Sequence, residues 1–470
     1  MSVLSQPQTG APPGPPRTWL FGNLKEFGRD QLGTMTRWAR EYGDLVSARF
    51  GPRHVLFANH PDLVEEILVN QNRKFIKHYR LRQTARTLGQ GMLTSEGEFW
   101  RGQRKLAQPA FHRERIANYA SLMVDSTVRM LQTWIDGEVR DVQADMMRLT
   151  LEIVAKTLFD AEIGGDTDDA TAAMETLTHA FIARTGNLIT PPHWIPTPLN
   201  LRIERAIRRL ERILMAFITE RRASGEDRGD LLSMLLHAQD EESGRRMSDQ
   251  QLRDEMMTLF LAGHETTANT LAWTWVLLSQ HPGAEARLHS ELDDVLGDRL
   301  PTVGDLPRLK YTESVVNETL RVNPTVWVIG REALEPVELG GYTIPAGTTL
   351  FMPQWVIHRD SRWFDDPEAF RPERWADGLM QRIHRYAYFP FGGGPRICIG
   401  NNFALMEATL ILATIARRYR LKLAPDAKIA PLPTITLRPA HGVRVVLTRR
   451  DASQNLLHKE SLGNFASPSN

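Results

Sequence analysis

Cys398 is the only cysteine among the 470 residues of this chain, and it lies in a segment that is unusually rich in glycine. The segment reads Phe391-Gly392-Gly393-Gly394-Pro395-Arg396-Ile397-Cys398-Ile399-Gly400. Glycine and proline disfavour a regular helix or a central strand, so the backbone is expected to turn tightly and to pass close to a flat partner. Asn401 follows as a candidate N-cap of an apolar helix, which places the thiol just before a helix N-terminus.

The surroundings of Cys398 favour a thiolate, because a helix N-terminus and backbone N–H groups stabilise negative charge on sulfur. A thiolate binds soft metals. A single cysteine cannot complete a zinc or iron–sulfur site, but it can serve as the single axial ligand of haem iron. The alternative is that Cys398 is a small buried hydrophobic residue, which is common for a cysteine without such a context.

The glycine-rich segment also matches a spaced pattern of five residue types, Phe-x-x-Gly-x-Arg-x-Cys-x-Gly. Its fixed positions are filled by Phe391, Gly394, Arg396, Cys398 and Gly400. In this segment the chain resembles the cytochrome P-450 superfamily of haem-thiolate monooxygenases. The resemblance implies that Cys398 is the proximal ligand of haem b, and that Phe391, Arg396 and Gly400 take part in binding that cofactor.

A second motif lies inside the longest predicted helix, which is expected to begin at a capping box of Ser248 and Gln251 and to end near Gln280. The motif is Ala-Gly-His-Glu-Thr at 262–266. A glycine within a helix costs about 1 kcal/mol relative to alanine, and threonine can bond back to the preceding turn, so a local opening of the helix is expected. Without further context this would be a harmless weak point.

The resemblance gives the Ala-Gly-His-Glu-Thr motif a chemical role. It implies that Ala262 and Gly263 border the distal face of the haem, where dioxygen fits, that Thr266 donates a hydrogen bond to the oxygen, and that Glu265 relays protons. Splitting dioxygen with release of water requires two protons, which an acid beside an alcohol can deliver. His264 occupies the variable position of the motif and is not expected to bind iron.

Trp100 and Arg104 lie four residues apart in a helix predicted to start at a capping box of Ser95 and Glu98, so they share one face. Taken alone, such a pair is usually a surface cation–π contact. The resemblance implies instead that both side chains donate to a haem propionate, and that Arg331 contacts a propionate as well.

Glu318 and Arg321 are three residues apart in another predicted helix, which alone would indicate an exposed ion pair. The resemblance implies that they form a buried network with Arg374, from the segment Phe370-Arg371-Pro372-Glu373-Arg374-Trp375. That network is structural, since it fixes the loop that carries the cysteine.

Several apolar residues are candidates for the wall of a substrate pocket by the same resemblance, and each could equally be an ordinary core residue. They are Met92, Leu93, Ala262, Val326, Val328 and Ile435. The weak pattern between Phe75 and Gly91 predicts a mobile loop, which the resemblance places over the substrate. The sequence does not identify the substrate, which in similar bacterial proteins is a fatty acid, terpene, steroid or polyketide.

The elements that must position these residues are mostly helical, with short strands around Gly51-Pro52 and Gly340-Gly341. The segment 203–217 has a helical apolar period and many arginines, which indicates a helix with a solvated face or, alternatively, a face that lies on a membrane. We therefore expect a mainly α protein with a small β-rich subdomain and the cytochrome P-450 fold, with haem between the long distal helix and the proximal cysteine loop. The expected divisions are a proline-rich lead at 1–20, one domain at 21–450 and a disordered polar tail at 451–470.

Composition limits the classes of function. The chain is 42% hydrophobic and 24% charged with a net charge of +1, so it is an ordinary globular protein without the basic surface that nucleic-acid binding requires. A single cysteine excludes internal disulfides and fits a reducing compartment. The N-terminus shows neither a signal peptide nor a membrane anchor, and a cytoplasmic monomer is expected.

The resulting hypothesis is a monooxygenase that inserts one atom of dioxygen into an apolar molecule. Its two electrons are expected from NAD(P)H through a separate ferredoxin or flavodoxin and its reductase, which Arg101, Lys105, Arg382 and Arg385 could attract. Two alternatives stay open: a haem-thiolate protein that only binds or senses ligands, and a relative that uses peroxide or isomerises its substrate. The adjacent Glu265 and Thr266 argue against a sensor, which needs no proton relay.

Overall fold

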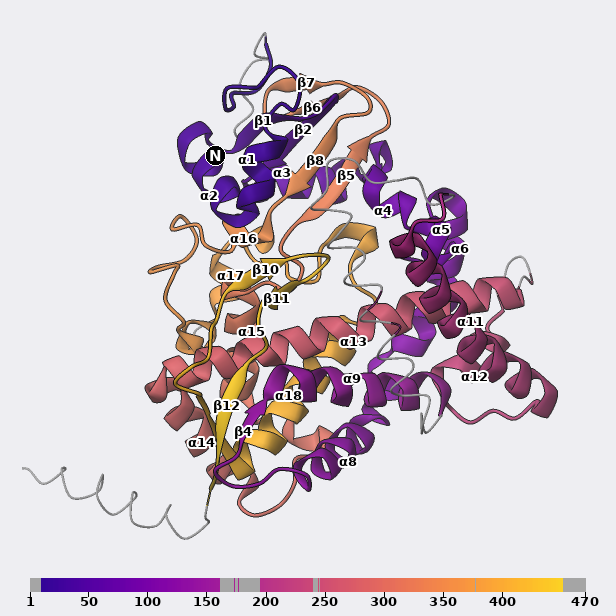
Figure 1. Ribbon diagram of the computed structural model, residues 1–470, viewed down its shortest axis with the longest axis vertical. Helices are drawn as coiled ribbons and strands as arrows, with labels where there is room; N and C mark the ends of the chain where they lie inside the picture. Colours follow the sequence, from indigo (N-terminus) through magenta and orange to yellow (C-terminus); the bar gives the residue numbers. More distant parts are fainter. Residues whose placement is uncertain are drawn as a thin grey trace, which may run out of the picture.

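The structure is a computed structural model, and it describes residues 10–160, 195–239, 246–376 and 378–450, with Ala173, Thr176 and Gly244 between them. Helices dominate, and the strands gather in small sheets, the largest near the N-terminus (Figure 1). The expectation for the tail 451–470 and the first part of the proline-rich lead, residues 1–9, lie outside the described residues.

The largest sheet brings the N-terminal strands together with strands from the second half of the chain, in the order β1-β2-β8-β5-β3. The predicted hairpin around Gly51 is confirmed, with Leu45 opposite Ala58, and β8 runs parallel to β2. These strands are β1 (Leu45–Phe50), β2 (Arg53–Ala58), β3 (Phe75–Lys77), β5 (Ile329–Ala333) and β8 (Thr349–Met352).

The predicted Gly-Gly hairpin is confirmed as well, between β6 (Val337–Leu339) and β7 (Tyr342–Ile344). Gly340 and Gly341 have φ values of 57° and 83°, the left-handed conformation that a two-residue hairpin turn of this kind requires.

The C-terminal strands form two further small sheets, ordered β4-β12-β9 and β10-β11. Their bounds are β4 (Val139–Asp141), β9 (Tyr419–Leu423), β10 (Pro431–Pro433), β11 (Leu437–Pro439) and β12 (Arg444–Arg449). The β10–β11 pair lies beside the long helix, where the Trp273 indole N–H donates to the Leu437 carbonyl at 3.0 Å.

Helices build the rest of the described chain. In the first half they are α1 (Leu24–Arg29), α2 (Gln31–Tyr42), α3 (Pro61–Glu65), α4 (Tyr79–Gln83), α5 (Ala85–Leu88), α6 (Gly97–Ala107), α7 (Arg113–Ala117), α8 (Ala120–Leu131) and α9 (Val142–Phe159). In the second half they are α11 (Pro198–Ser224), α12 (Leu231–His237), α13 (Asp249–Gln280), α14 (Pro282–Leu296), α15 (Lys310–Val322), α16 (Gln354–Ile357), α17 (Leu379–Arg382) and α18 (Asn401–Arg418). Among the described residues, no helix is both long and apolar enough to cross a bilayer.

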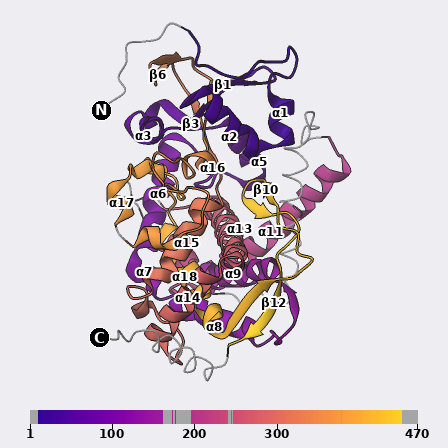
Figure 2. The same cartoon turned by 90° about the vertical axis from the view of Figure 1, so that its left-hand side faces the viewer.

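Helix α13 is the central element, and its 32 residues extend over about 48 Å. Its predicted capping box is confirmed: the Ser248 hydroxyl accepts from the Gln251 N–H, and the Gln251 side chain accepts from the Ser248 N–H. Figure 2 shows α13 nearly end-on, with α9, α15 and α18 packed around it. The helix therefore carries its middle residues through the interior of the fold.

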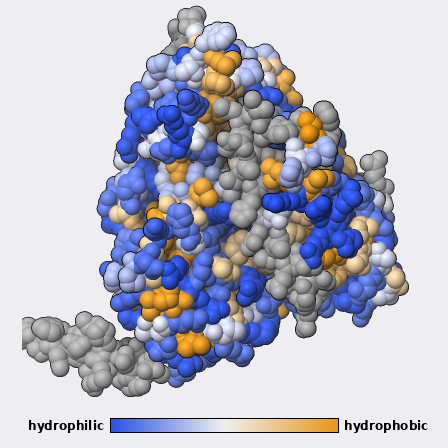
Figure 3. All heavy atoms as spheres, in the orientation of Figure 1, coloured by the Kyte–Doolittle hydropathy of each residue, from blue (hydrophilic) through white to orange (hydrophobic). Residues whose placement is uncertain are grey.

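Three apolar clusters form the core: a large one around α13, α15 and α18, a second between α6, α9, α11 and the first half of α13, and a third under the largest sheet. In α11 the apolar positions face inward and Arg202, Arg205 and Arg208 are exposed, so this helix has a solvated basic face. On the face shown in Figure 3, hydrophilic residues cover most of the described surface and apolar residues form small separate groups.

Three local predictions were wrong. The segment from Phe75 to Gly91 is not an irregular loop, because β3 joins the sheet through pairing with distant β5 and is followed by α4 and α5. Helix α6 is capped by Glu96 rather than Ser95, whose hydroxyl is buried without a partner. Helix α18 is capped by Gly400, and Asn401 is its first residue.

The expected opening of the long helix at Gly263 is also wrong, since α13 is continuous from Asp249 to Gln280. The predicted threonine bond is present: the Thr266 hydroxyl donates to the Ala262 carbonyl at 2.7 Å. This side-chain bond to the carbonyl one turn earlier is compatible with a continuous helix.

Candidate active site

The cysteine loop folds as the glycine pattern requires. Gly394 has a φ of 63°, and a Cβ there would lie 1.9 Å from the Leu68 carbonyl oxygen, so no larger residue fits. The Cys398 N–H donates to the Phe391 carbonyl at 2.9 Å, which closes the loop. Helix α18 begins directly after Gly400, and the thiol therefore lies at the start of this helix as predicted.

The Cys398 side chain is exposed, yet enough protein surrounds it for burial to raise the pKa of the thiol. A side chain can be both accessible and surrounded by protein when it faces a space inside the fold rather than the outer surface. The Gly400 N–H and the positive charge of Arg104 act in the opposite direction and lower this pKa. A metal ion would complete the ionisation, because a coordinated thiol loses its proton.

Cationic side chains gather beside the cysteine loop. The Arg104 guanidinium donates to the Ile397 carbonyl at 2.7 Å, next to the cysteine. The Arg396 guanidinium lies 4.7 Å from the centre of the Trp100 ring and forms an ion pair with Glu96. Arg396 is therefore the cation over Trp100, and the alternative of a cation–π contact between Trp100 and Arg104 does not hold.

The charges of this cationic group are not balanced. Burial and the nearby Arg396 lower the pKa of Arg331 to about 10. The Arg396 Nη1 atom is buried without a hydrogen-bond partner, and Glu96 is the carboxylate that offsets Arg331 and Arg396. A buried, unpaired donor among excess positive charge fits a ligand that brings carboxylates, and the two propionates of haem are such groups.

Sequence reasoning missed Lys77, which belongs to the same group. The pKa of Lys77 is lowered to about 7. Burial is the largest cause, and the positive charges of Arg396 and Arg331 act in the same direction. Its only local signal was a lysine in a segment without clear periodicity. The pairing of Lys77 with Arg331 across β3 and β5 could not be read from either segment alone.

Glu265 is buried on α13, and its carboxylate accepts a hydrogen bond from the Thr436 hydroxyl at 2.6 Å. Burial raises the pKa of Glu265, while Thr436, Arg438 and Asn269 act to lower it. Thr436 was missed by sequence reasoning, because it is 171 residues away in the chain. The acid is thus held by the turn between β10 and β11.

His264 lies against α9 rather than in a metal site. The Thr150 hydroxyl of α9 donates to the His264 carbonyl at 3.0 Å, and burial lowers the pKa of the imidazole to about 4. Gly263 also approaches α9 closely, since a Cβ there would lie 3.0 Å from Val154. The two helices therefore pack tightly at this point.

The predicted pocket residues do not share one environment. Met92 is buried in the second apolar cluster, and Val328 packs against the large cluster. Leu93 and Val326 are half-buried, and Ile435 is 51% exposed, next to the Thr436 that binds Glu265. Phe391 packs against the large cluster from the cysteine loop.

Glu318 and Arg321 are completely buried and form a bidentate ion pair with distances of 2.8 and 2.9 Å. The Arg374 guanidinium reaches the same carboxylate at 2.8 Å, and the Trp375 indole N–H, which was not predicted, donates to it at 2.9 Å. The structure thus brings the three residues of the expected network together in the interior.

The sequence model of the family described as cytochrome P-450 matches residues 12–445. The chain belongs to this family.

Several curated relatives of this cytochrome P-450 come from Streptomyces. Cyclooctatin synthase of Streptomyces melanosporofaciens is 41% identical over 84% of this chain and 87% of its own length. Cyclooctat-9-en-7-ol 5-monooxygenase of the same organism is 39% identical over 88% of this chain and 92% of its own. Pentalenene oxygenase of Streptomyces avermitilis is 35% identical, with the same coverage of 88% and 92%.

Membership identifies this cytochrome P-450 as a haem-thiolate monooxygenase that oxygenates an apolar molecule with dioxygen and electrons from an external redox partner. When bound, haem supplies the iron at which dioxygen is reduced and split. The thiol, the unbalanced cations and the unpaired Arg396 donor fit that group, as argued above. The alternatives of a sensor and of an isomerase receive no support from the names of these relatives.

Among the described residues, hollows are found in at least two places on this cytochrome P-450. One, of about 460 Å³, adjoins the cysteine loop. It is lined by Trp100, Arg101, Arg104, Lys105, Gln108, Gly394, Pro395 and Ile397.

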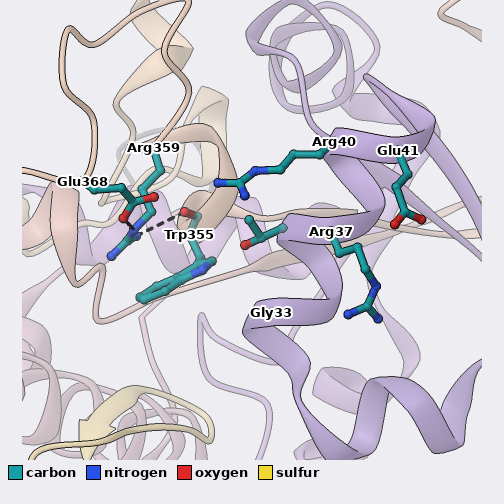
Figure 4. Close-up of a pocket in the computed structure, with 8 residues that line it drawn as sticks. Gly33, Arg37, Arg40, Glu41, Trp355, Arg359 and Glu368 are labelled. Atoms are coloured by element: carbon teal, nitrogen blue, oxygen red, sulfur yellow. Dashed lines mark hydrogen bonds and ion pairs between the residues drawn. The ribbon is translucent and has the colours of Figure 1, made fainter.

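The other hollow, also of about 460 Å³, lies between α2 and α16 and contains none of the predicted site residues. In Figure 4, Arg40 of α2 points toward Arg359, which pairs with Glu368 at 3.3 Å and covers the Trp355 ring. The second hollow is therefore no part of the candidate active site.

Proposed function

We propose that this cytochrome P-450 oxygenates a cyclic terpene. The names of its relatives support this substrate class, since two of them are named for the oxygenation of cyclooctat-9-en-7-ol and of pentalenene. The observation that carries the chemical part is the single thiol at the start of α18, beside an excess of buried cations. Helix α13, which packs against α18, bears an acid next to an alcohol.

In this proposal each predicted residue has a defined task. Cys398 would hold the haem iron through its thiolate, whose electron donation favours cleavage of dioxygen. The propionates are held by the indole N–H of Trp100 and by the guanidinium groups of Arg104, Arg331 and Arg396. The remaining cofactor contacts come from Phe391, Gly400, Ala262 and Gly263.

Glu265 and Thr266 are proposed to deliver protons. Burial raises the pKa of Glu265, so its carboxyl group holds a proton more readily than an exposed glutamate does. The Thr436 hydroxyl donates to the Glu265 carboxylate at 2.6 Å and holds the acid in place. In this proposal Glu265 supplies a proton, and the Thr266 hydroxyl, which donates to the Ala262 carbonyl at 2.7 Å, turns to donate a hydrogen bond to the oxygen that receives it.

Electrons are proposed to enter at the hollow beside the cysteine loop. Arg101 and Lys105 line it, and Arg382 and Arg385 add positive charge elsewhere on the chain. Such a surface suits an acidic ferredoxin or flavodoxin, supplied by a reductase that oxidises NAD(P)H. The proposal takes the protein to act as a monomer in the reducing cytoplasm, in keeping with its single cysteine.

The substrate proposal is tested by incubating the haem-loaded protein with a surrogate ferredoxin, its reductase and NADPH, and with pentalenene and cyclooctat-9-en-7-ol as probes. Labelled dioxygen should appear as one oxygen atom in a terpene product, in proportion to the NADPH consumed. Oxygenation of fatty acids or steroids in preference to both terpenes would contradict the substrate class. Product formation with peroxide alone, and none with the electron donors, would favour the peroxide-using alternative.

A further inference from the structure

Two buried side chains of opposite charge bind the backbone of Met92 from two different elements. The Glu255 carboxylate of α13 accepts the Met92 N–H at 3.0 Å. The Lys77 ammonium group of β3 donates to the Met92 carbonyl at 2.8 Å and to the Ser95 carbonyl at 2.6 Å. Lys77 and Glu255 are 5% and 1% exposed, so these are charge-assisted hydrogen bonds in the interior.

The loop around Met92 also approaches α13 as closely as a backbone can. The Asp254 carboxylate accepts the Gln90 N–H at 2.7 Å. A Cβ on Gly89 would lie 2.1 Å from that carboxylate, and a Cβ on Gly91 would lie 2.2 Å from the Thr258 hydroxyl. The two glycines thus allow the loop to lie directly on the helix.

Further polar contacts connect Lys77 with the cysteine loop. The Lys77 N–H donates to the Glu96 carboxylate at 2.7 Å, and Glu96 pairs with Arg396, two residues before Cys398. A series of polar contacts therefore joins α13, the Met92 loop, β3 and the cysteine loop. Burial disfavours both charges, raising the pKa of Glu255 to about 7 and lowering that of Lys77 to about 7, and each charge partly offsets this effect on the other.

The side chain of Met92 lies in the apolar cluster that also contains Trp100, Met257 and Phe260. Phe260 is two residues before Ala262 on α13. The clamped backbone thus fixes a large, flexible apolar side chain between the helix that bears Glu265 and Thr266 and the residue Trp100 beside the cysteine loop. Methionine adapts its shape readily, so its position depends strongly on what holds its backbone.

We propose that Glu255 and Lys77 are positioning residues that hold Met92 at the wall of the substrate pocket, and that they thereby set the affinity for bulky apolar ligands. The inference rests on the proposed function in taking Met92 as part of that wall. It assigns no chemistry to either residue. Without the hydrogen bonds from Glu255 and Lys77 to the Met92 backbone, the loop can move and the pocket changes shape. The haem and its cysteine ligand stay in place.

The test compares two ligands of the haem iron that differ in bulk, imidazole and the apolar azole clotrimazole, whose dissociation constants are measured by absorbance. Glu255→Ala removes the acceptor of the Met92 N–H and should weaken clotrimazole binding by about tenfold, with imidazole binding and the spectrum of the ferrous carbon monoxide complex unchanged. Glu255→Gln keeps an acceptor oxygen and should recover most of the loss. Glu285→Ala is the matched control, because Glu285 is a buried glutamate of α14 that contacts none of these residues.

Equal changes for both ligands, or none for either, would overturn the proposal, as would a Glu285→Ala variant that lost clotrimazole affinity to the same degree. If Glu255→Ala does not fold, Glu255→Asp provides the same comparison, because the shorter side chain withdraws the acceptor from the Met92 N–H. Met92→Ala tests the premise: unchanged clotrimazole affinity would place Met92 outside the pocket and refute the inference. None of these binding results depends on terpene turnover, so failure of the substrate proposal would be distinguishable.

Discussion

Replacing Arg321 by alanine removes the centre of the buried ion network. The guanidinium makes five hydrogen bonds, two to Glu318 and one each to the carbonyls of His358, Pro367 and Ala369. Removing one partner of a buried ion pair costs about 3–5 kcal/mol, because a charge and its acceptors remain in the interior. Net stabilities of proteins are about 5–15 kcal/mol, so the loss is a large fraction of the total.

The structure favours the lower end of this range. Glu318 keeps the Arg374 guanidinium at 2.8 Å and the Trp375 N–H at 2.9 Å, so its charge is not left alone. The Pro367 and His358 carbonyls, in contrast, lose the donor that binds them. We therefore expect Arg321→Ala to destabilise the protein by about 3 kcal/mol and to reduce the yield of haem-loaded protein.

The assay is the melting temperature and haem content of purified protein, with Arg362→Ala as control. Arg362 pairs with Asp44 at 2.8 Å, but the two side chains are 47% and 45% exposed, and such a pair contributes less than about 1 kcal/mol. Arg321→Ala protein with normal haem content and an unshifted melting temperature would refute the reasoning from burial.

Three further predictions concern single residues. Cys398→Ser should abolish the thiolate-type absorbance of the ferrous carbon monoxide complex, and survival of that spectrum would exclude Cys398 as the ligand. Thr266→Ala should keep haem and azole binding but release more of the supplied electrons as hydrogen peroxide; unchanged coupling of electrons to product would contradict its role. Glu407 is completely buried, and burial raises its pKa from 4.5 to about 8, although the nearby Thr267 hydroxyl acts to lower it. The folded state thus retains a proton that the unfolded chain releases, so stability falls as the pH rises through this window. The gain in melting temperature from Glu407→Gln should accordingly increase from about pH 5 to about pH 8, and a constant gain would contradict the assignment.

Sequence patterns were sufficient where the deciding interaction is local. Gly394 turns the cysteine loop at a φ of 63°, a left-handed conformation that glycine adopts readily because it has no side chain. The capping box of α13 likewise involves residues three positions apart, and it is present. The ion network could be predicted only through the family resemblance, because Arg374 lies 56 residues from Glu318 in the chain.

The errors and omissions came from contacts between distant segments. Ser95 has the residue type of an N-cap, but Glu96 takes the position while its carboxylate binds Arg396, 300 residues away. The strand at Phe75 exists because β5 offers it an edge, and no pattern within the segment signals that edge. Thr436 and Lys77 were missed for the same reason, as neither has a local motif.

The hydrogen bond between Thr436 and Glu265 has a consequence for protein engineering. Exchanging the β10–β11 turn between relatives is an obvious way to alter substrate preference, because Ile435 is a candidate wall residue in that turn. The same exchange would replace Thr436, the residue that holds the proposed proton-relay acid. Chimeras at residues 431–439 should therefore change regiochemistry and electron coupling together, unless the threonine is restored.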